Sequence, residues 1–248
     1  MSGPGARTGG RRSGRAGLPK DLVRRSALDA GLSLAGGEAG IRARVMRSGD
    51  HVPVASRYDD DLWERVPDDP RSAPGHLRRF VRSLGPADHA LDLGCGDGRL
   101  TLELEAERIT AADPSFVALE RARRRLGERP ETQLLELAPD APLPLPDSGH
   151  DLVLCAETIE HVRDVQLLLS EVRRVLRPGG RLALTTPAHG RLTGLDVLAR
   201  GFEARFDPLS PHVRHLTRRS LRQLLTDMGF AIESLRRRRG SLMTVARR

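Results

Sequence analysis

The stretch ALDLGCGDGRL, Ala90 to Leu100, places three glycines, Gly94, Gly96 and Gly98, directly after a short apolar run. Glycine weakens strands and helices alike, so a cluster of glycines needs a local reason. One explanation is a tight strand-to-helix turn that binds nothing. The other is a turn whose bare backbone lets a ligand approach closely. The rest of the chain has to distinguish between the two.

Short apolar segments alternate with amphipathic segments on both sides of this turn. Strands are predicted over residues 89–93, 108–112, 132–137, 151–155 and 181–186. Helices are predicted over about 98–105, 115–127, 164–176 and 217–229, with a terminal hairpin of residues 230–235 and 241–246. Because helices separate the strands, the strands should pair in parallel with helices on both faces. The sequence therefore predicts a doubly wound α/β fold, whose ligands bind at the carboxyl ends of the strands.

The second predicted strand ends in Asp113, nineteen positions after Gly94. A carboxylate at this position can accept two hydrogen bonds from ribose hydroxyls, and it would repel a 2′-phosphate. The pair Asp113-Pro114 also fits the start of a helix, where proline opens the first turn. The two roles are compatible, and together they favour a ligand with an unphosphorylated ribose.

At this point the residues resemble the class I S-adenosylmethionine-dependent methyltransferases, from Ala90 to about Arg248. The motifs that carry the resemblance stand in the family's order: LDLGCGDG, ITAADPS, LPLPDSGHDLVLCAETIEHV, LLSEVRRVLRPGGRLALTTP and HVRHLTRRSLRQLLTDMGF. The last is similar to small-molecule members, including ubiquinone-type O-methyltransferases. The resemblance implies a Rossmann-like, mostly parallel seven-stranded sheet whose last strand is antiparallel.

The resemblance also implies S-adenosylmethionine as the cofactor, with a role for individual residues. Backbone at Gly94 and Gly96 would lie against the methionine part, Asp92 would orient the amino group and Asp113 would hold the ribose. Asp140 stands one position after the place where the family often has an acid that contacts adenine. The full expected cofactor set is Asp92, Gly94, Cys95, Gly96, Gly98, Asp113, Pro114, Asp140 and Cys155. For the two cysteines, a structural role as small buried residues is the preferred interpretation.

Methyl transfer from a sulfonium is an in-line displacement, which requires alignment and removal of water rather than a covalent nucleophile. A hydroxyl acceptor also benefits from a base. His161, which follows Glu160 after the fourth strand, is the predicted catalytic base. Capping or packing of the following helix is an equal alternative for this pair. No set of side chains has metal-ligand spacing, so no metal is expected. The predicted function is methyl transfer to a small-molecule acceptor, most simply to a hydroxyl oxygen.

Two other functions stay open from the sequence. The chain carries a net charge of +8, and residues 1–50 hold ten basic and four acidic side chains, which suits an RNA or protein methyltransferase. Against RNA, an aromatic content of 3% leaves few surfaces on which flipped bases could stack. The other alternative is a non-catalytic, methyltransferase-like binding protein. Such a protein would not require the glycines or Asp113.

Composition divides the chain into three parts. Residues 1–50 predict a basic, largely disordered extension, residues 51–85 a helical lid, and residues 86–248 the methyltransferase domain. No apolar run approaches the roughly 20 residues of a membrane helix, and the N-terminus lacks the apolar stretch of a secretory signal. We therefore expect a cytoplasmic protein that does not contact membranes.

Overall fold

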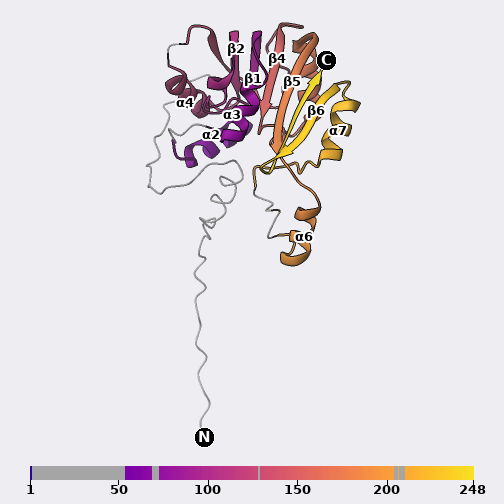
Figure 1. Cartoon of the computed structure of the whole chain (residues 1–248). Helices are drawn as coiled ribbons and strands as arrows, with labels where there is room; N and C mark the ends of the chain where they lie inside the picture. Colours follow the sequence, from indigo (N-terminus) through magenta and orange to yellow (C-terminus); the bar gives the residue numbers. More distant parts are fainter. Residues whose placement is uncertain (2–53, 69–72, 128, 204–205, 207–209) are drawn as a thin grey trace.

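The structure is a computed structural model of the chain. It describes Met1 and residues 54–68, 73–127, 129–203, 206 and 210–248, so nearly all of the expected extension over residues 1–50 lies outside the described residues. A single sheet forms the centre of the molecule, with helices packed on both faces (Figure 1).

The strands are β1 (Ala87–Leu93), β2 (Ala106–Asp113), β3 (Thr132–Glu136), β4 (His150–Ala156), β5 (Leu176–Pro187), β6 (Ala231–Arg238) and β7 (Ser241–Arg247). The helices of the described residues are α2 (Val54–Arg65), α3 (Gly75–Arg82), α4 (Phe116–Leu126), α5 (Val165–Val175), α6 (Arg191–Arg200) and α7 (Arg218–Asp227), with a 3-10 helix η1 (Thr101–Glu103).

The sheet has seven strands in the order β3-β2-β1-β4-β5-β7-β6. Strands β1 to β5 pair in parallel, whereas β7 runs antiparallel between β5 and β6. The strand order reverses between β1 and β4, and in such sheets the crevice at the reversal is where ligands bind. This confirms the predicted Rossmann-like sheet with an antiparallel terminal strand.

The central strands are buried on both faces, as parallel strands between helices must be. Leu91 and Leu93 pack into the larger core cluster, which includes buried residues of α5 and α7. Ala90, one position out of phase, packs instead with Val81 of α3 on the other face. Alternate side chains of β1 therefore pack into two hydrophobic cores, one on each face of the sheet.

Helix starts that face the ligand edge are capped by side chains. Ser115 accepts a hydrogen bond from the Ala118 N–H at the start of α4, and Asp164 accepts one from Leu167 N–H at the start of α5. Each cap satisfies an N–H group that the helix itself leaves without a partner.

Two elements differ from the prediction. The helix expected over residues 98–105 is reduced to η1, because Leu104 already has an extended backbone that leads into β2. The segment between β5 and α7, which had no predicted structure, contains α6, and this helix projects away from the sheet (Figure 1). None of the described helices has the length and apolar character needed to cross a membrane.

Candidate functional site

The glycine-rich loop leaves β1 at the point where the strand order reverses. All three of its glycines have positive φ, at 77°, 54° and 77° for Gly94, Gly96 and Gly98. The backbone also runs very close to its neighbours. A Cβ at Gly94 would lie 2.4 Å from Thr158, and a Cβ at Gly96 would lie 2.7 Å from Trp63. The glycines are therefore required by backbone conformation and by close packing together.

Asp113 ties the end of β2 to this loop. Its Oδ2 accepts a hydrogen bond of 2.9 Å from the Gly96 N–H, and its Oδ1 accepts one of 2.9 Å from the Ser115 N–H. Burial raises the pKa of Asp113 to about 7, against the opposing effect of these two hydrogen bonds. A carboxylate has about four acceptor positions, so roughly two are left for a ligand.

Asp92 lies near the carboxyl end of β1, two residues before Gly94. It is 2% exposed and accepts a hydrogen bond of 2.6 Å from the Thr101 hydroxyl. Burial raises the pKa of Asp92 to about 6. Two buried carboxyl groups thus flank the glycine loop, and both hold their protons more tightly than an exposed aspartate does.

Helix α2 packs over the same loop. Asp60 accepts hydrogen bonds from the Ser115 hydroxyl at 2.7 Å and from the Val117 N–H at 3.2 Å, so it joins α2 to the start of α4. The Trp63 ring lies against Gly96 and within cation–π distance of Arg121, whose guanidinium carbon is 5.8 Å from the ring centroid. Asp60 was missed in the sequence, although three consecutive aspartates there were a visible signal.

The remaining expected cofactor residues lie in different surroundings. Cys95 and Cys155 are buried, and burial raises the pKa of both thiols. Pro114 lies between the Asp113 carboxylate and the start of α4. Asp140 lies in an exposed loop with φ of 51°, where it pairs with Arg163 at 3.4 Å. Asp140 is therefore the one member whose side chain is already engaged by a surface cation.

The segment after β4 also reaches this edge. The Thr158 hydroxyl lies 3.4 Å from the Gly94 carbonyl oxygen, which joins this segment to the glycine loop. Burial raises the pKa of Glu160 to about 8, and the nearby Glu157 carboxyl adds to the rise. Burial and the neighbouring His212 lower the pKa of His161 to about 4. His161 is therefore neutral near pH 7, which a base must be, although its basicity is low.

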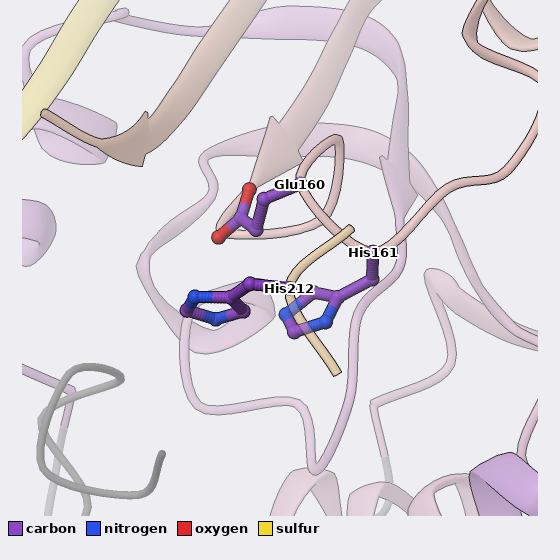
Figure 2. Close-up of side chains that lie close together, drawn as sticks. All are labelled: Glu160, His161 and His212. Atoms are coloured by element: carbon purple, nitrogen blue, oxygen red, sulfur yellow. The ribbon is translucent and has the colours of Figure 1, made fainter. Parts of the chain in front are cut away.

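The sequence analysis did not predict that His212 lies beside Glu160 and His161. It lies before α7, yet it meets Glu160 and His161 at the end of β4 (Figure 2). The three residues form a possible metal-ligand set, contrary to the expectation from sequence that no such set exists. Spacing along the chain could not reveal it, because its members are brought together only by the fold.

Comparisons with known proteins agree with this architecture. Residues 91–184 match the family model described as a methyltransferase domain. The chain is 39% identical over 113 residues to the demethylmenaquinone methyltransferase of Symbiobacterium thermophilum, covering 42% of this chain and 45% of that protein. It is 34% identical over 106 residues to the 27-O-demethylrifamycin SV methyltransferase of Amycolatopsis mediterranei, covering 41% of this chain and 39% of that protein. The chain thus spans less than half the length of these two curated relatives.

A solved structure supports the same assignment. The S-adenosylmethionine-dependent methyltransferase of Mesorhizobium loti superposes with a TM-score of 0.52 at 25% identity, over 70% of this chain and 96% of that one. The match to the family model includes the glycine loop, Asp113 and the segment after β4. The sheet order is that of the Rossmann-like methyltransferase fold, and residues 91–184 of the chain match the methyltransferase domain family.

Proposed function

We propose that the chain transfers a methyl group from S-adenosylmethionine to a small-molecule acceptor. The observation that carries this proposal is the hydrogen bond between Asp113 and the Gly96 N–H at the reversal of strand order. This hydrogen bond connects a carboxylate that can accept from ribose hydroxyls with a loop whose glycines have no side chains to block a ligand. A purely structural turn does not need a buried acid with acceptor positions to spare.

The cofactor would lie along the carboxyl ends of β1 and β2. Gly94 and Gly96 would face its methionine part, Asp92 would orient the amino group and Asp113 would accept hydrogen bonds from the ribose. Asp140 would reach the adenine only by giving up its exposed pairing with Arg163. Surface ion pairs of this kind contribute little, so that exchange costs little.

The donor supplies a methyl group that is already activated on a sulfonium. The chain's own task is to align the acceptor, to exclude water and to receive a proton if the acceptor is a hydroxyl. In this proposal α2 would serve as a lid, since Trp63 already lies against Gly96. His161, at the end of β4, is the candidate base. A hydroxyl oxygen is the acceptor atom we favour.

Small molecules are favoured over RNA and protein for two reasons. The relatives named above act on a quinone precursor and on a rifamycin, as their names state. The chain also has few aromatic side chains on which a base could stack. The segment between β5 and α7, which includes α6, would line the acceptor side and set its specificity.

Two measurements test this proposal. Calorimetric titration of the full chain with S-adenosylmethionine should give one site, and no binding at millimolar ligand would favour a non-catalytic scaffold. Incubation with methyl-labelled donor and a cell extract, split into small-molecule, RNA and protein fractions, should label the small-molecule fraction. Label confined to RNA or protein would overturn the proposed acceptor class.

A further inference from the structure

Three side chains with metal-binding atoms converge at the carboxyl end of β4. Glu160 and His161 follow the strand directly, and His212 comes from the segment before α7 (Figure 2). One oxygen of the carboxylate and one nitrogen of each ring all lie within 4.8 Å of one another. Figure 2 shows the two rings side by side, with a Glu160 oxygen directed toward them.

Backbone hydrogen bonds hold this arrangement in place. The N–H groups of Val213 and Arg214 both donate to the carbonyl oxygen of Glu160, at 2.9 and 3.1 Å. The His161 N–H donates to the Thr158 carbonyl oxygen at 2.9 Å. The meeting of two segments some fifty residues apart is therefore fixed by the main chain and does not depend on side-chain rotamers.

Glu160 provides independent evidence for a missing ligand. The residue is 1% exposed, and its Oε2 accepts a hydrogen bond of 2.9 Å from the Thr186 hydroxyl. Its Oε1 is buried and has no hydrogen-bond partner among the described residues. A buried acceptor without a partner is destabilising, and more so when it is charged. A cation bound at this oxygen would remove that penalty.

His161 is oriented as a metal ligand would be. Its Nδ1 lies 3.1 Å from the Pro211 carbonyl oxygen. A carbonyl can only accept, so Nδ1 carries the proton and Nε2 presents its lone pair. Histidines that bind metals usually donate their second ring N–H to a carbonyl or carboxylate, which fixes the tautomer.

We propose that Glu160, His161 and His212 bind one divalent transition-metal ion, such as Zn²⁺, with open positions for a ligand. Two imidazole nitrogens and one carboxylate oxygen are a ligand set of catalytic zinc sites and of related iron sites. Tetrahedral bonds of about 2.1 Å place ligand atoms about 3.4 Å apart, so the widest pair must close by no more than about 1.4 Å. His212 lies outside helices and strands, where a side-chain rotation can supply this movement.

The position of the site connects it to methyl transfer, and this part of the inference rests on the proposed function. Thr158 contacts Gly94 on one side, and its carbonyl oxygen binds the His161 N–H on the other. An acceptor hydroxyl held by the metal ion would lose its proton to water more easily. Its oxygen would then bond to the methyl carbon while the carbon–sulfur bond breaks and its electron pair stays on sulfur. Held by metal, His161 would be a ligand and not the base.

Metal titration of the full chain tests this inference apart from activity. The chain, freed of affinity tag and treated with a chelator, is titrated with Co²⁺ or Zn²⁺ by calorimetry, and Co²⁺ binding is followed by its visible absorption. One equivalent should bind. His212→Ala should weaken binding at least tenfold, since even loss of an outer-shell partner costs about 10–100-fold.

His215→Ala is the matched control, because this residue lies on the same segment but packs against His189 and Phe206. It should bind the metal as the wild type does. Equal affinity in His212→Ala and wild type, or loss of binding only in His215→Ala, would overturn the assignment. Titration with S-adenosylmethionine is run in parallel. A chain that binds this cofactor but no metal refutes the metal site alone, whereas a chain that binds metal but no cofactor refutes the proposed function.

Discussion

Asp113→Asn is expected to weaken S-adenosylmethionine binding and to remove much of its pH dependence. The wild-type carboxylate uses two of its roughly four acceptor positions for hydrogen bonds from the Gly96 and Ser115 N–H groups. The positions left over suit two ribose hydroxyls. Asparagine has nearly the same shape but accepts through Oδ1 alone, so it loses the charge, half of the acceptors and one of the two hydrogen bonds from these N–H groups. Because hydrogen bonds to charged groups contribute about 1.5–3 kcal/mol, we expect a loss of about 1–3 kcal/mol, or roughly 5–150-fold in affinity.

The pH dependence follows from the raised pKa of Asp113, which is about 7 in the free protein. Ribose hydroxyls donate to the ionised form, so binding should favour it. The ionised fraction rises from about one tenth at about pH 6 to about nine tenths at about pH 8, which gives roughly tenfold tighter binding. Asp113→Asn should lack this part of the change. Comparing the two proteins cancels the titration of the cofactor's own groups.

Calorimetry at both pH values measures the effect, with Glu136→Ala as control. Glu136 ends the neighbouring strand, in register with Asp113, but its side chain is exposed. The control should bind the cofactor as the wild type does. An Asp113→Asn protein with wild-type affinity at about pH 8, or with the same pH slope as wild type, would refute the role of this carboxylate.

Three further predictions concern the loop and its surroundings. Gly96→Ala should weaken cofactor binding and shift the fluorescence of Trp63, the only tryptophan, because a Cβ there would lie 2.7 Å from its ring; an unchanged emission spectrum would contradict this packing. Asp60→Ala should lower the free energy of unfolding by about 0.5–2 kcal/mol in chemical denaturation, since Asp60 caps α4, whereas the exposed Asp61→Ala should not. Asp92→Asn should become more stable relative to wild type as pH rises from about 4 to about 8, by up to about 3 kcal/mol. Burial raises the pKa of Asp92 to about 6, so the protonated carboxyl stabilises the fold and this stabilisation is lost when it ionises. Thermal unfolding of both proteins at both pH values measures the difference, and a difference in stability that does not change with pH would contradict this burial.

The sheet was predictable from the sequence because its signals are local. Short apolar strands, amphipathic helices between them and the glycine turn are each recognised within a few residues, and together they predicted the strands and their parallel pairing. The helix expected over residues 98–105 was wrong for a related reason. The chain is already extended at Leu104 and pairs with β1 from Ala106 onward, and this pairing is not visible in the local pattern.

The site was less accessible to sequence analysis, because its contacts are long-range. Nothing near Gly96 in the sequence indicates that Trp63 packs against it, or that Asp60 caps α4. The cluster of Glu160, His161 and His212 depends on a loop whose path is fixed by two backbone hydrogen bonds to Glu160. Helix α6 was missed because its apolar residues are largely exposed, so that no buried stripe marks it.

The most direct test of the central claim is a crystal structure of the full chain with bound S-adenosylhomocysteine. The account predicts the ligand's ribose within hydrogen-bond distance of Asp113, and its amino acid part along the backbone of Gly94 and Gly96. A ligand bound elsewhere on the molecule, or a glycine loop that stays empty at saturating ligand, would contradict it.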